Sequence, residues 1–276
     1  MKYDLSNFYK DLKLKFNKSN GKEVILFLME EFSKTISLKD ERAIIAVGNE
    51  LASFLRVKGQ TDLAYKIYKV IKKLVLDNYG FISKDYASLL INISNCHIVS
   101  KNYDLAIDTL NETETILSQL SDTKHLMASV YNNRSQAFRA KNMLDLAQED
   151  IEKALKIIKN EEKIAVSKIN LAEILILKKK YAKALVNVNE AILYYEKNKL
   201  RLPHLANAYA TAANIYYNNK EYYTSVYYYE KAIKVFDETV GEGPVKEILI
   251  KNLNQAKKQK EISWMVWNYQ KNIFMI

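Results

Sequence analysis

Few side chains in this 276-residue sequence are placed to do covalent or metal chemistry. The single cysteine, Cys96, is followed directly by His97. Neighbouring residues on a helix point about 100° apart, so these two side chains cannot hold one metal ion together, and His97 is expected to be a core residue. The other two histidines, His125 and His204, have no serine, cysteine or acid at a catalytic spacing. We therefore expect no enzyme activity, no metal site and no cofactor.

The more informative side chains are three asparagines, Asn92, Asn133 and Asn170, which lie 41 and 37 residues apart. An Asn amide offers two donor hydrogens and an acceptor, so a row of them can pair with the N–H and C=O groups of an extended peptide. Asn is also a poor helix former, which makes three in one helical register informative. The alternative is that each amide bonds within or between helices and fixes their packing.

Other polar or aromatic residues extend this row into a predicted partner-binding face. Two of them, Arg56 and Arg139, lie about one turn further along their helices and would suit a carboxylate, although an exposed Arg near a helix end is also an ordinary surface residue. The full predicted face consists of Asn92, Asn133, Asn170, Asn95, Gln136, Asn214, Arg56, Arg139 and Tyr217.

The elements that would position this face are helix pairs, of which the sequence contains five. Each second helix carries a small anchor residue, then an apolar or aromatic residue four positions later and another residue, small in most copies, three beyond that. The anchors are Ala64, Ala106, Ala147, Ala184 and Ser225, separated by 42, 41, 37 and 41 residues. A small anchor lets two helices approach closely.

The first helix of each pair precedes its anchor. Packing positions lie nine residues before the anchor, at Leu55, His97, Phe138, Leu175 and Tyr216, and thirteen before it, at Leu51, Ile93, Arg134, Leu171 and Ala212. The turns between the two helices carry Gly59, Lys101, Asn142, Lys179 and Lys220.

This spacing resembles the tetratricopeptide repeat (TPR), with repeats longer than the usual 34 residues. In that respect it is similar to the repeats of kinesin light chains and of bacterial peptide-sensing regulators. The resemblance implies an all-α fold, a right-handed superhelical α-solenoid of antiparallel helix pairs with a concave surface lined by the first helices. The predicted repeats span 41–80, 81–121, 122–160, 161–199 and 200–240.

Both flanks of the array are predicted to be helical and to belong to the same continuous solenoid domain. Residues 1–40 indicate a degenerate first pair, and 244–276 a capping helix followed by an apolar tail, with Gly241–Pro244 as the boundary. In the tail Ile262, Val266, Tyr269, Ile273 and Ile276 follow heptad-like steps, and Trp264, Trp267 and Phe274 make another side apolar. Such a tail must be covered, by the last repeat, by self-association, or by the groove of a neighbouring molecule.

Charge and hydrophobicity argue against a nucleic-acid-binding protein and against a membrane protein. The formal net charge is +10, but the lysines are scattered, so we expect a solvated surface and no nucleic-acid partner. No apolar run approaches the roughly 20 residues of a membrane helix, and no signal peptide is recognisable. With one cysteine, these features predict a soluble protein of a reducing cytoplasm.

A closer resemblance is carried by Phe8–Leu12, Tyr131–Asn133, Glu152–Leu155 and His204–Tyr209. These segments resemble the repeat arm of a bacterial protein family, some members of which continue into a nucleotidyltransferase-like domain. The Gly-Ser motif and paired aspartates of that domain are not found in this sequence, so the resemblance does not imply its activity here.

The sequence therefore predicts a cytoplasmic bacterial scaffold that binds a protein or an extended peptide along the first-helix face. A peptide-responsive regulatory sensor is the alternative, and a basic solenoid that binds nucleic acid ranks last.

Overall fold

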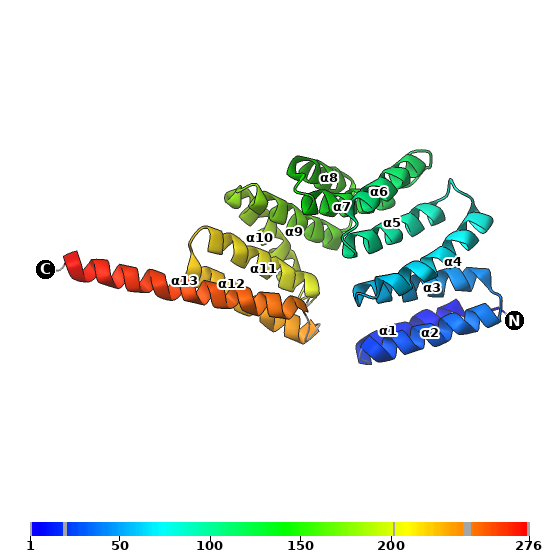
Figure 1. The fold of residues 1–276 in the computed structure, drawn as a ribbon, viewed down its shortest axis with the longest axis horizontal. Coiled ribbons are helices and arrows are strands. Elements are labelled where there is room, and N and C mark those ends of the chain that lie inside the picture. The colour runs from blue at the N-terminus through cyan, green and yellow to red at the C-terminus, as the bar shows by residue number, and fades with distance from the viewer. Residues whose placement is uncertain (1, 19–20, 201, 240–243, 275–276) are drawn as a thin grey trace. The chain divides into compact units, whose positions relative to one another are not determined.

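The fold is known from a computed structural model that describes residues 2–18, 21–200, 202–239 and 244–274; side chains are described for these except at 17, 18, 21, 244, 269 and 271–274. The described residues form thirteen α-helices and no strand, which confirms the all-α prediction (Figure 1). They divide into two compact units, Met1–Met143 and Leu144–Ile276. The division falls inside the predicted third repeat, 122–160.

The first unit contains the helices of residues 1–143. These are α1 (Leu5–Lys18), α2 (Gly21–Ser37), α3 (Glu41–Val57), α4 (Thr61–Tyr79), α5 (Lys84–Val99), α6 (Tyr103–Leu117) and α7 (Lys124–Ala140). In this unit α3 packs on α4 and α5 on α6, so the first two predicted repeats are helix pairs. The helices α1 and α2 precede them and pack on each other.

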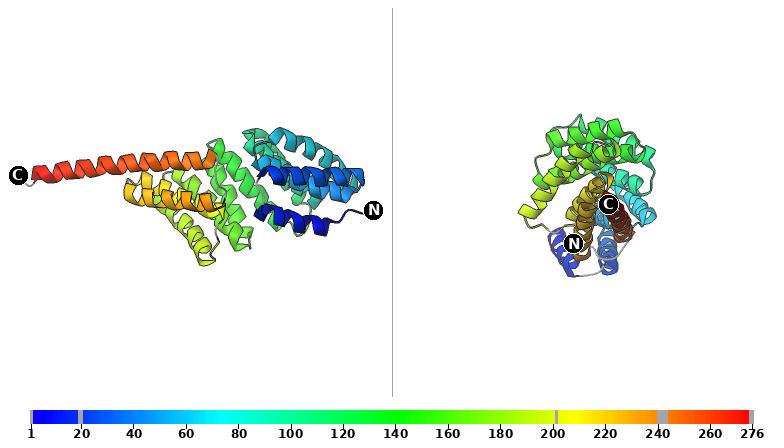
Figure 2. Two further views of the ribbon diagram at one scale, coloured as in Figure 1. Left: turned by 90° about the horizontal axis from the view of Figure 1, so that it is seen from below. Right: turned by 90° about the vertical axis from the view of Figure 1, so that its left-hand side faces the viewer.

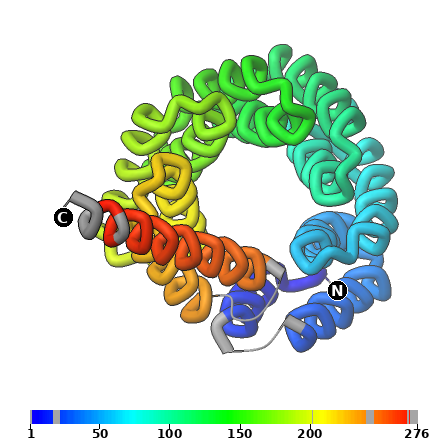
Figure 3. Tube along the Cα trace, turned by 60° about the vertical axis from the view of Figure 1, so that its left-hand side comes forward, coloured from blue at the N-terminus to red at the C-terminus, as the bar shows by residue number. Residues whose placement is uncertain are grey.

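The second unit contains the remaining helices. These are α8 (Leu144–Ile157), α9 (Glu161–Leu177), α10 (Tyr181–Lys197), α11 (Pro203–Asn218), α12 (Tyr222–Thr239) and α13 (Pro244–Phe274). Here α9 packs on α10 and α11 on α12, and the trace runs along one helix and back along the next (Figure 3). Of the predicted boundary Gly241–Pro244, residues 241–243 lie outside the described part of the chain.

The predicted anchors form the cores of both units. All five, Ala64, Ala106, Ala147, Ala184 and Ser225, have no exposed surface. Their apolar partners four positions later, from Tyr68 to Tyr229, are at most 4% exposed. Ser225 differs from the alanines in donating a 2.8 Å hydrogen bond to the carbonyl of Ala213 on α11, which satisfies its buried hydroxyl.

The turns inside the five pairs share one geometry. Gly59, Lys101, Asn142, Lys179 and Lys220 all adopt φ between 57° and 75°, the left-handed conformation that ends many helices. In each turn the next N–H returns to the carbonyl five residues back, as from Gln60 to Leu55 and from Glu221 to Tyr216. The sequence therefore located these helix ends correctly, although four of the five residues are not glycine.

The helix α13 is longer than those around it and only its first part is buried. Leu249, Leu253 and Ala256 are buried and α13 packs on α12. Beyond them the ribbon runs past the helices of its own unit (Figure 2), and Ile262, Trp264, Met265, Val266 and Trp267 are 42–60% exposed. The side chains of Tyr269, Ile273 and Phe274 and all of Ile276 lie outside the described residues.

Candidate functional site

The first helices of successive pairs lie close together. Within the first unit α3 contacts α5 and α5 contacts α7, and within the second α9 contacts α11. Within the described part of each unit, the second helices of successive pairs, such as α4 and α6 or α10 and α12, make fewer contacts with each other than the first helices do. In each unit the first helices therefore share one face, which we call the first-helix face.

In the first unit, two of the predicted asparagines lie half-buried on this face. The Nδ2 of Asn92 on α5 donates a 2.9 Å hydrogen bond to Oδ1 of Asn49 on α3. The Asn133 side chain on α7 makes no hydrogen bond to the part of the chain that the structure describes. One amide of the row thus ties two helices together, as the packing alternative expects, and the other remains available to a ligand.

Glu50 holds the equivalent position in the first repeat, and the sequence analysis missed it. It lies fourteen residues before its anchor Ala64, as Asn92 lies before Ala106, so the repeat offset itself was the signal. Glu50 is half-buried, and this burial raises the pKa of its carboxyl group. Within the described residues it has no hydrogen bond or ion pair. The pKa of Tyr9 on α1 is raised by burial and then by the Glu50 charge, which places α1 next to this end of the face.

In the second unit the row continues with Asn170 on α9. Asn170 is half-buried, and its side-chain amide has no hydrogen-bond partner among the described residues. Thr211 takes the same register on α11 but is buried, and its hydroxyl donates to the Asn207 carbonyl at 2.8 Å. Asn214 is exposed and accepts a 2.9 Å bond from Asn218. Of the two residues at this register in the second unit, Asn170 and Thr211, only Asn170 has a side chain without a hydrogen bond among the described residues.

Asn95 and Gln136 lie three residues beyond Asn92 and Asn133 on α5 and α7. Both are half-buried, and neither side chain forms a hydrogen bond within the described residues. The first unit thus presents free amide groups on two neighbouring first helices.

The remaining predicted residues lie against other helices. Burial raises the pKa values of Tyr68 and Cys96, and the nearby Arg56 charge offsets part of that rise in each; the Nε atom of Arg56 is buried without an acceptor. Burial lowers the pKa of Arg139, which lies near Tyr103 at the start of α6.

Tyr217 packs edge-on against Tyr222 at the start of α12, with ring centres 5.5 Å apart. These three side chains are half-buried, as the three asparagines of the row are, and each lies against a neighbouring helix.

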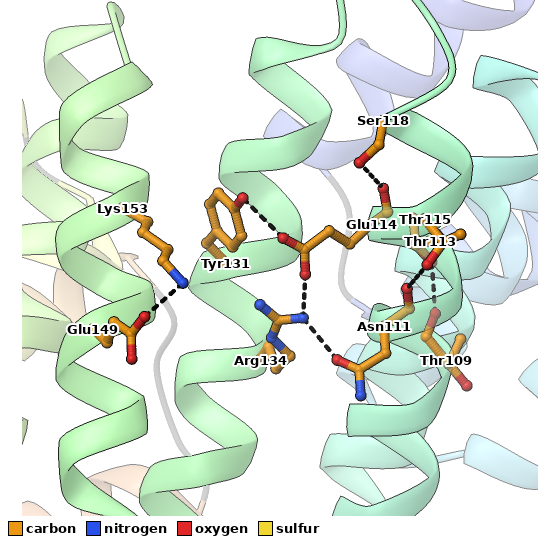
Figure 4. Close-up of polar contacts among 10 residues, drawn as sticks. All are labelled: Thr109, Asn111, Thr113, Glu114, Thr115, Ser118, Tyr131, Arg134, Glu149 and Lys153. Carbon is orange, nitrogen blue, oxygen red and sulfur yellow. Dashed lines mark hydrogen bonds and ion pairs between the residues drawn. The ribbon is translucent and has the colours of Figure 1, made fainter.

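A polar cluster joins α6 to α7 where the other repeats have apolar or small residues. Arg134 is 7% exposed and bonds to Glu114 at 2.5 Å and to Asn111 at 2.7 Å. Tyr131 donates to the other oxygen of Glu114 at 2.9 Å (Figure 4). Because the guanidinium and the carboxylate neutralise each other, this cluster is not a free anion site.

The catalytic and metal candidates from the sequence do not assemble into a site. Cys96 is buried, and burial raises the pKa of its thiol to about 11, so it stays protonated. His97 bonds through Nδ1 to the Tyr65 hydroxyl at 2.8 Å, and burial lowers its pKa. The described residues contain no group of three His, Cys, Asp or Glu side chains that could hold a metal ion. None of the described helices is long and apolar enough to cross a bilayer.

Comparison with known proteins finds relatives by structure only. No protein-family model and no curated protein matches the sequence. A Rap protein complexed with Competence and Sporulation Factor matches with a TM-score of 0.61 and 16% identity, over 83% of this chain and 64% of that one. The APC/C hetero-tetramer Cut9–Hcn1 matches with a TM-score of 0.64 and 11% identity, over 91% of this chain and 42% of that one.

A third match is to the TPR-like repeats of a kinesin light chain of Podosopora anserina. Its TM-score is 0.54 at 14% identity, over 70% of this chain and 95% of that one. At these identities the likeness shows the fold alone, and it confirms the predicted TPR-like helical solenoid.

Proposed function

We propose that this protein is a non-enzymatic scaffold that binds an extended segment of another protein along its first-helix face. The observation that carries the proposal lies within the first unit, where two neighbouring first helices present unbonded, half-buried amides: Asn95 on α5, and Asn133 and Gln136 on α7. An amide that is half-buried and unbonded gains a partner when a peptide backbone lies beside it. Two proteins of this fold have a partner in their structures, Competence and Sporulation Factor in one and Hcn1 in the other.

The Glu50 carboxylate indicates which chemical group the bound segment would place next to α3. A half-buried carboxylate without a partner favours a ligand that brings an N–H group or a positive charge. We therefore propose that the bound segment places a basic side chain or an amino terminus next to α3.

Affinity capture from an extract of the source cell tests the proposal. The bait is the full chain, and the comparison bait carries Asn133→Ala and Gln136→Ala. A partner that is enriched on the first bait and depleted on the second supports the proposal. Equal recovery on both baits contradicts the assignment of the face.

The likeness to a Rap protein complexed with Competence and Sporulation Factor favours a second candidate, a peptide-responsive sensor whose compactness changes on binding. Small-angle scattering with and without peptide pools distinguishes the two. A smaller radius of gyration with peptide supports the sensor, and an unchanged radius with every pool counts against it. Nucleic-acid binding remains the third candidate, and steeply salt-dependent retention on RNA or DNA would support it.

Self-association through residues 262–276 is a further proposal, since the described apolar side chains of this segment are exposed. Gel filtration of the full chain and of a chain ending at Lys260 tests it. If the apparent mass of the shortened chain falls by more than the mass of the 16 removed residues, self-association is supported. A fall equal to the mass of those residues contradicts it. In keeping with the sequence prediction, we propose the cytoplasm as the place of action.

A further inference from the structure

A pocket of about 320 Å³ lies in the second unit where the end of α10, the start of α11 and the middle of α12 meet. Two of these, α10 and α12, are second helices, so the pocket is separate from the first-helix face. Leu200 and Leu205 supply apolar lining, and the polar groups come from Tyr195, Glu196, Lys199, Tyr209 and Lys231. The volume is at the lower end of the range for small-molecule sites.

Tyr195 is the unusual member of this pocket. Its side chain is fully buried, yet its hydroxyl has no hydrogen-bond partner. Other buried tyrosines of the chain are satisfied, since Tyr68 pairs with Ser53 at 3.1 Å and Tyr209 donates to Glu196 at 2.5 Å. A buried hydroxyl without a partner is unfavourable, and a ligand acceptor in the pocket would remove that penalty. Burial also raises the Tyr195 pKa, so the group remains an O–H donor at neutral pH.

The charged groups around Tyr195 differ in whether they already have partners. Glu196 accepts hydrogen bonds from Tyr209 and, at 3.2 Å, from Lys231. The Lys231 ammonium also lies 4.6 Å from the ring centre of Tyr209, which holds it in place. The Lys199 side chain is exposed at the rim and has no ion pair within the described residues. Glu162 on α9 is a second carboxylate near Tyr195, since its charge also raises the Tyr195 pKa. The Lys231 ammonium is occupied by Glu196, Tyr209 and Tyr227, so the donors without a partner are the Tyr195 hydroxyl and the Lys199 ammonium.

We propose that this pocket binds a carboxylate group attached to a small apolar skeleton. A carboxylate brings acceptor oxygens both for the Tyr195 hydroxyl and for the Lys199 ammonium, the two donors without a partner. The leucines and tyrosine rings of the lining suit the carbon skeleton. Two sources carry this chemistry, a free small carboxylic acid and the C-terminal residue of a polypeptide.

Calorimetric titration of the full chain tests the proposal with defined probes. The probes are N-acetyl-leucine, an N-acetylated hexapeptide ending in Leu with a free carboxylate, and the C-terminal amide of each. We expect at least one carboxylate probe to bind at least 10-fold more tightly than its amide, since hydrogen bonds to charged groups are the stronger class. Binding of N-acetyl-leucine indicates a small acid, and binding of the hexapeptide alone indicates a polypeptide terminus. Absence of binding by both carboxylates up to millimolar concentration overturns the proposal.

Two variants connect binding to the pocket. Tyr195→Phe and Lys199→Gln are each expected to lower the affinity for the probe that binds the wild type by about 10-fold. The matched control is Tyr194→Phe, because Tyr194 is the neighbouring half-buried tyrosine and does not line the pocket. Unchanged affinity in Tyr195→Phe overturns the proposal. So does a clearly lower melting temperature of Tyr195→Phe without ligand, because it would show that the hydroxyl already has a partner inside the protein.

Discussion

The side-chain amide of Asn92 donates to that of Asn49 over 2.9 Å, and this bond links the first helices of two successive pairs. This bond distinguishes Asn92 from the other two asparagines of the row. Asn92 contributes to the structure of the first unit, whereas Asn133 and Asn170 have amides with no partner in the described chain. The packing explanation therefore holds for Asn92, and peptide binding stays a prediction for Asn133 and Asn170.

Alanine substitutions should separate these roles. We expect Asn92→Ala to lower the free energy of unfolding by about 1 kcal/mol, because it removes a hydrogen bond and leaves Asn49 without its donor. Asn133→Ala should be neutral or raise stability by up to about 0.5 kcal/mol, because Ala is the better helix former. Urea denaturation measures both. A loss in Asn133→Ala as large as in Asn92→Ala would show that Asn133 is also a packing residue.

Glycine in the left-handed turns should stabilise the solenoid. Lys179 has φ of 57°, which is unfavourable for a residue with a side chain. Lys179→Gly should raise the free energy of unfolding by about 0.5–1 kcal/mol, net of the entropy that glycine loses. The control is Lys180→Gly, because Lys180 has φ of −91° and gains nothing from glycine. Equal effects of the two substitutions would contradict this account of the turns.

The anchors should tolerate no added volume. Ala184 has no exposed surface, so Ala184→Leu forces the helices of its pair apart and should lower stability by about 1–3 kcal/mol. Ala182 is exposed on the same helix, and Ala182→Leu should change stability by less than about 0.5 kcal/mol. Thermal and urea unfolding compare the two. A tolerated leucine at 184 would mean that the anchor does not set the helix spacing.

Glu50 should make stability depend on pH. Because burial raises its pKa in the folded state, folding favours the protonated form, and the favourable contribution present at low pH is lost as pH rises through the folded-state pKa. Glu50→Gln should therefore raise the melting temperature at pH 7 and have little effect below the unfolded-state value of about 4. Melting curves from pH 3.5 to 8 measure this. A variant that melts below the wild type at pH 7 would indicate a stabilising partner for Glu50.

Much of the fold was predictable from the sequence because it repeats. Burial of a small residue at each helix crossing leaves a periodic signal, and the left-handed turn follows at a fixed offset. The Asn49–Asn92 bond was not predictable, because Asn49 lies one residue off the register that the pattern defines. Arg134 was assigned to packing but not to a charge pair, since its partner Glu114 lies on another helix at no repeated spacing.

The division into two units and the Tyr195 pocket also escaped the sequence analysis. Position 195 reads as one tyrosine among 20, and only the three-dimensional arrangement shows that its hydroxyl is buried without a partner. Such features depend on helix–helix geometry that no local pattern encodes.

The affinity of the full chain for its captured partner tests the proposed binding face most directly. Calorimetry would compare the wild type with Asn133→Ala/Gln136→Ala, two residues of α7 in the first unit, and with a control, Asp108→Ala/Asn189→Ala, which alters exposed residues of the second helices α6 and α10. We predict about 10-fold weaker binding by the first variant, from the loss of two hydrogen bonds, and unchanged binding by the control. Equal affinity of all three proteins, or a loss confined to the control, would contradict binding along the first-helix face.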